Sequence, residues 1–596
     1  MVSTLTWQQL RDLKLSELSD AADGWGAASR HADSAREQVD GRMSGPLAKT
    51  QESESAKAAV KRLKRLSNNY YYIQAECGLI RGSVDGLATE LAKQRKHLLE
   101  ALDDAAALGY TVNENGSIGY PAGGESELTG EEVPGGTAYG QNGRFDSSNP
   151  SPSSGKEGLY QPGTGEDGAQ FKSPNPHYAK AKDIADRVTY AVLRAQEIDV
   201  RYFGALEKLK AAPGLDVDTK TWADVASDID TVGASAMPYL KDQIPLDKSP
   251  ADRKAWWEHL TADQREEYLS AFPGLIGNLD GIPAEVRDDA NRENLKVLIA
   301  KLEGQNDDLS KSQLEGLKGI QEKLNEGGSP PMFLLGVGDE GNGRAIVSYG
   351  NPDTSKNVSA YVPGLGTTLD GDFADDTVRR ALQTQKGAYK YDHSTASIVW
   401  LGYDAPGVAE VASTGDANKG APAYRSFMEG IGATNENENP HITAIGHSYG
   451  SLLVGTAARA HGGIPGVDDI VLLGSPGTGA QTAGELNVGK GHVFAASAGN
   501  DPVSWLPAKS SLLGPAPAIV NSLDDERWFG RDPTSKEFGA TRIKSGDGPL
   551  PLWLSGEGPT PAHSGYFDPD RNPSAANNIA KIVAGRSDHI KTEEPR

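Results

Sequence analysis

The N-terminal part of the chain carries apolar residues at helical spacing. A shorter stripe runs from Leu18 to Met43, and Ser44-Gly45-Pro46 follows it as a helix breaker. In the next stretch, steps of three and four residues alternate and give one apolar seam close to a heptad repeat. This seam consists of Ala56, Val60, Leu63, Leu66, Tyr70, Ile73, Cys77, Ile80, Val84, Leu87 and Leu91, continued by Leu98, Leu102 and Ala105. Two such helices joined by a tight turn predict an antiparallel helical hairpin over residues 1–116.

A polar segment interrupts this helical pattern. Residues 117–177 are dominated by Gly, Ser, Pro, Asn and Glu. Such a segment cannot bury enough apolar area to offset the entropy lost on ordering, so we expect a flexible linker. Helical spacing returns at Ala181, and we expect region 178–326 to pack on the first hairpin and to lead into the next domain.

From residue 327 the pattern changes from helix to strand. Short apolar runs alternate first with turns and then with helical segments. The expected strands are 332–336, 344–349, 357–362, 396–401, 441–445, 469–473 and 492–496. Short apolar strands that alternate with helices are typical of a mostly parallel sheet covered on both faces. Residues 327–596 are therefore expected to form an α/β domain.

The composition narrows the classes of function. Only 37% of the 596 residues are hydrophobic, and 70 Gly and 35 Pro indicate long loops or a linker between cores. The formal net charge is −23, and an acidic surface repels the phosphate backbone, so we expect no nucleic-acid partner. The single cysteine, Cys77, allows no intrachain disulfide and no cysteine-based zinc site. We expect neither a metal nor an organic cofactor.

The hydrophobic runs are short throughout the chain. None approaches 18 consecutive apolar residues, and the N-terminus lacks a basic region followed by an apolar one. The sequence therefore predicts a soluble chain without a transmembrane segment. It is expected in the cytoplasm, or outside the cell by a route that reads no N-terminal signal peptide.

The strongest chemical signal is the GxSxG pattern Gly446-His447-Ser448-Tyr449-Gly450. The pattern alone arises by chance in a glycine-rich chain, but here an apolar strand runs into it and a helix-compatible run follows at once. Small residues are needed on both sides because the backbone doubles back. The turn also brings the hydroxyl to a helix N-terminus, where amide groups stabilise a developing anion. Ser448 is the expected nucleophile.

The serine needs a base and an orienting carboxylate, which follow it in the order Asp or Glu, then His. Asp501 lies just past the last expected strand, where open α/β sheets place their working groups. Asp404 is the main alternative, although it precedes the serine. His563, late in the chain and in a loop, is the preferred base. The histidines weighed against it are His461, His492 and His589, and His447 inside the elbow is given only a packing role.

Two backbone amides are expected to form an oxyanion hole. One belongs to Tyr449, and the other to Leu365 in the loop Val362–Thr367. The glycines of that loop let the backbone approach a substrate closely, although an ordinary tight turn is the alternative. Each donor of this kind typically supplies about 3–4 kcal/mol of transition-state stabilisation.

Residues from about Leu260 to Phe567 resemble an actinobacterial α/β-hydrolase family of unknown function. The resemblance rests on a lead-in at 276–288 (IGNLDGIPAEVRD), on YVPG at 361–364, on WLGYDAP at 400–406, on the serine elbow, and on FGA at 538–540. It implies an α/β-hydrolase fold, here preceded by an α-helical bundle region, and an esterase-like or lipase-like serine hydrolase. The family has no settled substrate class.

The N-terminal hairpin is similar to WXG-type helical hairpins exported by type VII secretion. Trp25-Gly26 lies within the first helix rather than at the turn, and Ala27 replaces the glycine of the motif. However, YTVNE at 110–114, directly after the second helix, fits the YxxxD/E export pattern. The resemblance implies a type VII secretion partner. A cytoplasmic enzyme that forms homo-oligomers through its helices is the alternative.

Two functions follow from these observations. The first is a serine hydrolase that cleaves an ester-type bond, or an amide or thioester bond, of a small-molecule or lipid-like acyl substrate. The second is a secretion-associated effector or interaction protein whose helical bundle is the functional part. The intact order Ser448, Asp501, His563 favours the enzyme.

Overall fold

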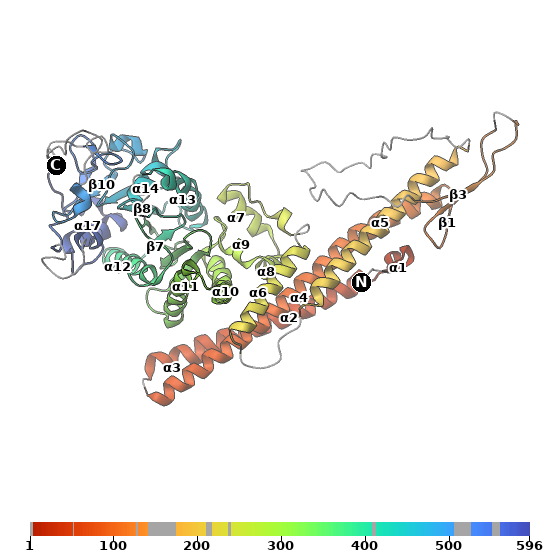
Figure 1. Cartoon of the computed structure of the whole chain (residues 1–596), viewed down its shortest axis with the longest axis horizontal. Helices are drawn as coiled ribbons and strands as arrows, with labels where there is room; N and C mark the ends of the chain where they lie inside the picture. The colour runs from red at the N-terminus through yellow and green to blue at the C-terminus, as the bar shows by residue number, and fades with distance from the viewer. Residues whose placement is uncertain are drawn as a thin grey trace. The chain divides into compact units, whose positions relative to one another are not determined.

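The chain forms two compact units. The computed structural model describes residues 4–51, 53–126, 129–140, 175–209, 217–236, 240–407, 413–505, 526–550 and 561–596. The first unit comprises Met1–Leu215 and Asp230–Lys241, and the second Asp216–Ile229 and Asp242–Arg596. The expected region 178–326 is thus divided between the two units. The first unit is dominated by long helices, and the second contains the large sheet (Figure 1).

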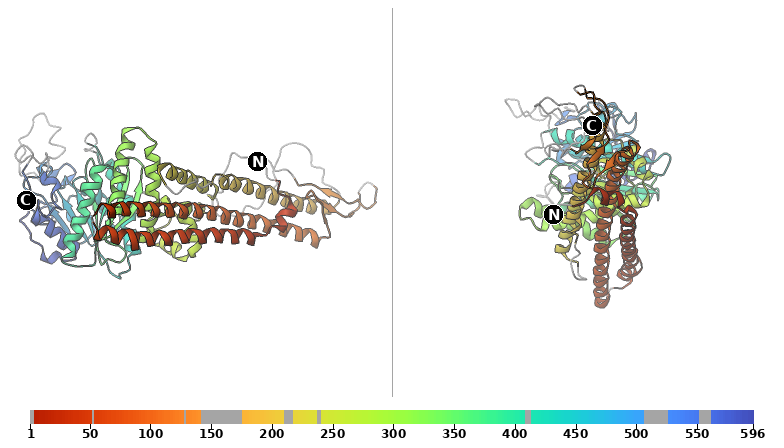
Figure 2. Two further views of the ribbon diagram at one scale, coloured as in Figure 1. Left: turned by 90° about the horizontal axis from the view of Figure 1, so that it is seen from below. Right: turned by 90° about the vertical axis from the view of Figure 1, so that its right-hand side faces the viewer.

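Three long helices build the first unit. They are α2 (Leu15–Gln38), α4 (Glu54–Ala107) and α5 (His177–Leu206), with the short α1 (Trp7–Asp12) before them. α4 packs against both α2 and α5, and the three run side by side (Figures 1 and 2). The expected apolar seam of α4 is buried in its C-terminal part, where Leu91 and Leu98 share one core with Ile184 and Val188 of α5. Earlier in the helix the prediction fails, because Leu66 and Ile73 are exposed. Burial of this seam, rather than helix propensity, stabilises so long a helix.

The expected helix break at Ser44-Gly45-Pro46 is wrong. Helical backbone continues through it, first as the π-helix η1 (Val39–Ser44) and then as α3 (Gly45–Thr50). Proline is tolerated there because it lies in the first turn of α3, where its missing N–H group has no helical partner. The chain reverses only between Thr50 and Glu54.

The expected linker is partly structured. Its beginning forms a small antiparallel sheet of β1 (Thr111–Val112), β2 (Ile118–Tyr120) and β3 (Gly136–Ala138). Ile118 and Ala138 are buried in the core of the helical unit, and this apolar burial offsets the entropy of ordering. Residues 141–174 of the expected linker lie outside the described residues.

An eight-stranded sheet forms the centre of the second unit, in the order β13-β10-β9-β8-β6-β7-β5-β4. The parallel strands are β6 (Asn357–Val362), β7 (Thr395–Leu401), β8 (His441–His447), β9 (Asp469–Leu473), β10 (Val493–Ala496) and β13 (Thr541–Arg542). The antiparallel strands at one edge are β4 (Met332–Gly338) and β5 (Arg344–Tyr349). All the strands expected from the apolar pattern are present. The sheet also contains β13, which was not expected because its two residues are too few to show an apolar pattern.

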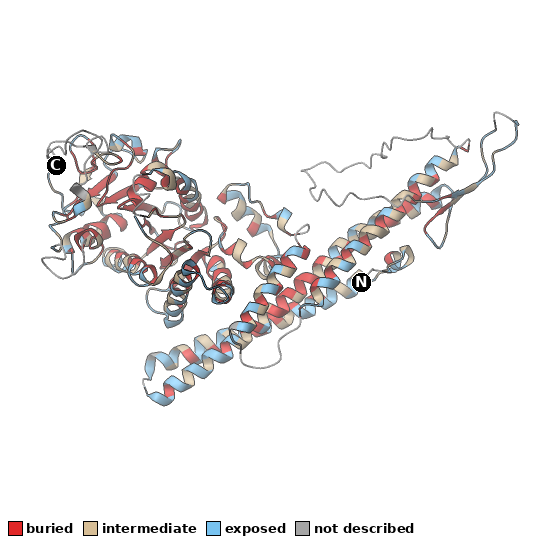
Figure 3. Cartoon of the chain, in the orientation of Figure 1, coloured by how far each residue is buried: buried red, intermediate tan, exposed pale blue. Residues whose placement is uncertain are grey.

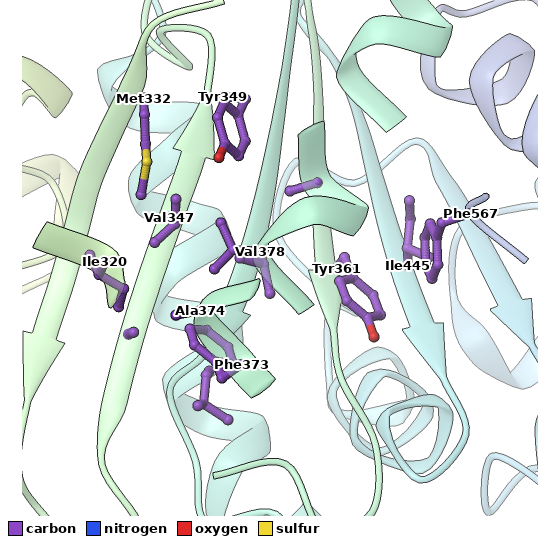
Figure 4. Packing of buried hydrophobic residues seen from close by; sticks show 14 of the residues in the cluster. Ile320, Met332, Val347, Tyr349, Tyr361, Phe373, Ala374, Val378, Ile445 and Phe567 are labelled. Atoms are coloured by element: carbon purple, nitrogen blue, oxygen red, sulfur yellow. The ribbon is translucent and has the colours of Figure 1, made fainter. Parts of the chain in front are cut away.

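Helices cover both faces of this sheet, as expected. One face packs against α11 (Asp308–Glu326), α12 (Val378–Tyr389) and α17 (Pro573–Val583), and the other against α13 (Gly415–Thr434) and α14 (Gly450–Arg459). Alternate residues of each strand point into the two cores, so Ile445 joins the first core and Ala444 the second (Figure 4 shows the first). Strands β6, β7, β9 and β10 are therefore buried along their whole length (Figure 3).

Several helices precede the sheet in the chain. They are α6 (Thr219–Ala236), α7 (Pro250–His259), α8 (Ala262–Ala271), α9 (Pro273–Gly277) and α10 (Ala284–Glu303). Side chains on and before α10 bind the backbone groups along the free edge of β4. These bonds join Asp288 to the amide of Leu334 (2.6 Å), Asn291 to the carbonyl of Leu334 (3.1 Å), Asn278 to both groups of Val337 (2.9 Å each) and Arg292 to the carbonyl of Met332 (3.0 Å). An unpaired edge invites pairing with another chain, and these side chains close it.

We predict that Asn291→Ala destabilises the second unit. Asn291 is fully buried, and its amide group donates to the carbonyls of Gly277 (2.7 Å) and Leu334 (3.1 Å). Its removal takes this donor from the carbonyl of Leu334 and leaves the carbonyl of Gly277 with only Arg287 (3.2 Å), so the free energy of unfolding should fall by about 1–3 kcal/mol. Urea unfolding measures this value. Asn294→Ala is the matched control, because its amide lies 3.5 Å from the carbonyl of Val337, and it should lose less than half as much.

We also predict that stability decreases as the pH rises above about 6.5, the ordinary pKa of histidine. Asp469, which is 2% exposed, binds His441 (2.9 Å) and His492 (2.8 Å) at the amino ends of the central strands. Burial alone would lower the pKa of His441, but the hydrogen bond and charge of Asp469 outweigh it and raise the pKa. A raised folded-state pKa stabilises the protein at low pH, and this contribution is lost as pH rises through that pKa.

Urea unfolding at a series of pH values tests this second prediction. Asp469→Asn should flatten the decrease between pH 6 and 8, whereas His589→Gln in the exposed C-terminal tail should leave it unchanged. If the stability of Asp469→Asn still decreases between pH 6 and 8 as in wild type, the pH dependence arises from other groups.

Candidate active site

Ser448 lies in the sharp turn between β8 and α14. Its φ is 54°, a left-handed conformation that only one other non-glycine residue among those described adopts. The serine is 7% exposed, and its amide donates to the carbonyl of Leu473 at the end of β9 (2.9 Å). A strained, non-glycine backbone between a strand and a helix is the geometry that the GxSxG pattern predicts.

The two glycines of the elbow have no room for a side chain. A Cβ atom on Gly450 would lie 2.2 Å from the carbonyl oxygen of Val362, and one on Gly446 would lie 2.7 Å from the Cα atom of Ser451. The backbone of β8, the elbow and the loop after β6 therefore meet at van der Waals distance. This close approach is why the turn requires glycine before and after the serine.

Asp501 and His563 are in direct contact. Asp501 follows β10 and is fully buried, and His563 belongs to the short helix α16 (Pro561–Ser564). The Nδ1 atom of His563 lies 3.0 Å from both carboxylate oxygens. With Nδ1 donating to the carboxylate, Nε2 is the nitrogen that can accept a proton.

Asp501 is surrounded by hydrogen-bond donors. Besides His563, the amide of Val503 donates to Oδ1 (2.9 Å) and the hydroxyl of Tyr566 to Oδ2 (2.6 Å). Burial alone would raise the pKa of Asp501, but these hydrogen bonds and the charge of His563 outweigh it and lower the pKa. The carboxylate is therefore ionised at neutral pH, as an orienting group requires.

Gly474 connects the serine to this pair. Its neighbour Leu473 holds the amide of Ser448, and Gly474 itself has a φ of 51°. A Cβ atom at Gly474 would lie 2.6 Å from Oδ2 of Asp501 and 2.8 Å from Nδ1 of His563. The end of β9 thus contacts both the elbow and the Asp–His pair. Among the described residues, no hydrogen bond joins the Ser448 hydroxyl to the imidazole. Such bonds often tighten only when substrate binds.

The loop after β6 lies against the serine. A Cβ atom on Gly364 would lie 2.6 Å from Cβ and 3.1 Å from Oγ of Ser448. Two bonds hold this loop: the hydroxyl of Tyr403 donates to the carbonyl of Pro363 (2.8 Å), and the amide of Gly366 to the carbonyl of Pro406 (2.9 Å).

The two amides expected to form the oxyanion hole belong to residues that adjoin parts of the chain in contact at the elbow. Tyr449 follows the serine directly and begins α14, and Leu365 follows Gly364 in the loop after β6. Neither amide donates a hydrogen bond to any residue that the structure describes.

The alternative carboxylate is occupied elsewhere. Asp404 forms a two-pronged ion pair with Arg344 (2.7 and 2.8 Å) and accepts the amide of Asn342 (2.8 Å). The hydrogen bond from Arg344 lowers the pKa of Asp404. This aspartate fastens the β4–β5 hairpin to the end of β7.

The other histidines also lie away from the serine. His492 binds Asp469 at the amino end of the strands, the opposite end from the elbow. His461 is exposed just after α14, and His589 lies beside Asp588 (3.4 Å) near the C-terminus. None of the three is recorded in contact with Ser448 or Asp501.

The sequence analysis missed two supporting side chains, Tyr566 and His447. His447 is buried, and its Nε2 atom lies 2.7 Å from the carbonyl oxygen of His563. Burial, with the charges of His563 and Arg380, lowers the pKa of His447 well below its ordinary value. A neutral imidazole that donates to this carbonyl holds the segment of His563 in place, so His447 does more than pack beside the sheet. No residue spacing in the sequence predicts the contacts of Tyr566 or of His447.

The residues that the structure describes contain no group of three or more His, Cys, Asp or Glu side chains placed to bind a metal ion. They also contain no helix with the length and apolar content needed to cross a membrane.

Comparison with known proteins bears on the fold of the second unit. Residues 339–511 match the family model described as "Alpha/beta hydrolase". Uncharacterized protein Rv2079 of Mycobacterium tuberculosis is 29% identical over 403 residues, which cover 59% of this chain and 59% of that protein. Uncharacterized protein Rv0963c of M. tuberculosis and uncharacterized protein Mb0988c of Mycobacterium bovis are each 34% identical over 218 residues, which cover 35% of this chain and 80% of theirs. Through its second unit, the chain belongs to the alpha/beta hydrolase family.

Proposed function

We propose that the chain is a serine hydrolase that cleaves an ester-type acyl bond through a covalent acyl-enzyme. Ser448 is the nucleophile, His563 the general base and acid, and Asp501 the group that orients the imidazole. One observation carries the proposal: a buried, ionised carboxylate holds an imidazole against Gly474, and the neighbouring Leu473 binds the amide of a serine in a left-handed turn.

The reaction needs two similar steps. Ser448 Oγ bonds to the acyl carbon while its proton passes to Nε2 of His563, and the amides of Tyr449 and Leu365 stabilise the oxyanion. The bond to the leaving group then breaks, and His563 returns the proton to that group. Water attacks the acyl-enzyme in the same way, so the acid is released and Ser448 regains its proton.

The substrate class follows from the chemistry of the site. A serine with two open amides acts on a carbonyl, so an ester is the simplest substrate, and a thioester or amide uses the same steps. The loop that supplies one amide presents the side chain of Leu365, which is 37% exposed, toward solvent. An apolar group at this loop favours a small-molecule or lipid-like acyl chain.

Residues 327–596 supply all the groups that this mechanism uses. The helical hairpin of residues 1–116 takes no part in the chemistry. A role for it in type VII export or in oligomerisation stays a prediction, because the family match covers only residues 339–511.

We predict that Ser448→Ala abolishes covalent labelling by a fluorophosphonate probe and lowers kcat for p-nitrophenyl esters by about 10⁴-fold or more. Asp501→Asn should lower kcat by about 10⁴-fold, because the imidazole then takes the wrong tautomer. Asp404→Asn is the matched control and should stay within a few-fold of wild type, since Asp404 is bound to Arg344. Failure of the native wild-type protein to label would contradict the proposed function.

We further predict that Gly474→Ala lowers kcat by about 100-fold or more with little change in the far-ultraviolet circular dichroism spectrum. The added methyl group would push Asp501 and His563 away from the serine, and a displacement of about 1 Å has an effect of this size. Gly462→Ala is the matched control, because Gly462 also has positive φ (79°) but has open space around it. Its kinetics should equal those of wild type, and equal losses in both variants would assign the effect to backbone strain.

A further inference from the structure

We propose that Tyr566 is a positioning residue of this site, whose hydroxyl fixes the carboxylate of Asp501 and thereby the imidazole of His563. The proposal rests on the proposed function. It adds a fourth side chain through which the Asp–His pair is oriented and its proton affinity is set.

The hydroxyl of Tyr566 bridges two parts of the turn that presents Asp501. It donates to Oδ2 of Asp501 (2.6 Å) and accepts the amide of Ala498 (2.9 Å). The amide of Asp501 in turn donates to the carbonyl of Ala498 (3.1 Å). Tyr566 is fully buried, so no water replaces its hydroxyl at either partner.

The donors around Asp501 divide between its two oxygens. Val503 donates to Oδ1 and Tyr566 to Oδ2, while Nδ1 of His563 lies at an equal 3.0 Å from both. One donor on each side fixes the plane of the carboxylate, and the imidazole lies symmetrically across it. Without the donor on Oδ2, the carboxylate is free to rotate about its Cβ–Cγ bond and take the imidazole with it.

The base and the tyrosine come from one short segment. Tyr566 lies three residues after His563, directly after α16 and Gly565. Both side chains therefore reach the same carboxylate from one piece of chain. The tyrosine fastens this piece to the turn after β10, so it fixes where the base lies relative to the sheet.

The surrounding charges are few. The ring of His447 lies 4.5 Å from that of His563 and 6.1 Å from that of Tyr566, and His447 is neutral because its pKa is lowered. Arg380 acts on His447, and Arg596 interacts electrostatically with Tyr566. The phenolic O–H is therefore the main group, besides the imidazole, that offsets the charge of the carboxylate.

This arrangement gives the hydroxyl two separable effects on catalysis. Its loss should loosen the imidazole, which lowers kcat without changing substrate binding. Its loss should also leave more negative charge on Asp501, which favours the protonated imidazole. The acidic limb of the pH profile of kcat/KM, which reports the free base, should therefore move to higher pH.

The test compares Tyr566→Phe with Tyr424→Phe in the full chain. Tyr424 is the matched control, because it is also fully buried and its hydroxyl donates to the carbonyl of Ala360 (3.0 Å) in β6. We expect Tyr566→Phe to lower kcat for a p-nitrophenyl ester by about 10-fold to 100-fold. KM should stay within about twofold, and the acidic limb should move to higher pH. Tyr424→Phe should change neither kcat nor the pH profile.

Incorporation of 3-fluorotyrosine at position 566 provides a second variant that keeps the shape of the side chain. Its more acidic phenol is a stronger donor, so the acidic limb should move to lower pH, opposite to the phenylalanine variant. If Tyr566→Phe fails to fold, the shift of the acidic limb in the 3-fluorotyrosine variant tests the inference on its own.

The outcomes are distinct. The inference is overturned, even if kcat falls, when the acidic limb of the kcat/KM profile stays in place in both Tyr566 variants. It is also overturned when the limb moves to lower pH in Tyr566→Phe or to higher pH in the 3-fluorotyrosine variant. A wild-type protein that neither labels at Ser448 nor hydrolyses esters overturns the proposed function instead.

Discussion

A carboxylate without access to water has to be surrounded by hydrogen-bond donors, and the site is organised around one such group. Asp501 has no exposed surface, so its negative charge would be strongly destabilising without partners. The partners come from a backbone amide two residues on and from two side chains of a segment about sixty residues later in the chain. Stabilising this charge therefore also brings the imidazole to the end of the sheet. Because each donor favours the ionised form, the carboxylate keeps a lowered pKa despite its burial. The orientation of the imidazole and the stability of this corner of the fold thus depend on the same hydrogen bonds.

The second constraint is steric. Four glycines, Gly364, Gly446, Gly450 and Gly474, lie where a Cβ atom would come within 3 Å of the serine, of its turn, of the loop after β6 or of the Asp–His pair. Backbone at these places takes the position that side chains would otherwise fill, and this is how the elbow, the loop after β6 and the Asp–His pair pack closely together. The chain has 70 glycines, and its composition alone indicates long loops. These four show another use of glycine, since each permits a specific close approach.

The sequence predicts those parts of the site that depend on local pattern. The elbow could be predicted because a strand, a small-x-Ser-x-small turn and a helix follow one another directly, and the strands could be predicted because both of their faces are apolar. Asp501 was assigned by its place after a strand, and the structure puts it in contact with His563. Tyr566, His447 and Gly474 could not be found in this way. Their roles depend on which distant residues they touch, and neither a buried tyrosine nor a glycine after a strand differs locally from many others. The helix break placed at Pro46 failed for a related reason, because a proline in the first turn of a helix continues it.

The free edge of the sheet shows where the hydrolase unit begins in physical terms. The family match starts at residue 339, and the change of period in the sequence lies at about residue 327. However, the backbone groups along β4 are bonded by Asn278, Asp288, Asn291 and Arg292, all of which precede that boundary. A sheet without these residues would expose a row of unpaired donors and acceptors. The lead-in is therefore part of the unit that it precedes, and the second unit accordingly includes residues well before the first strand. A boundary drawn from hydrophobic period alone marks the first strand, whereas the boundary of a stable unit also includes whatever covers its edges.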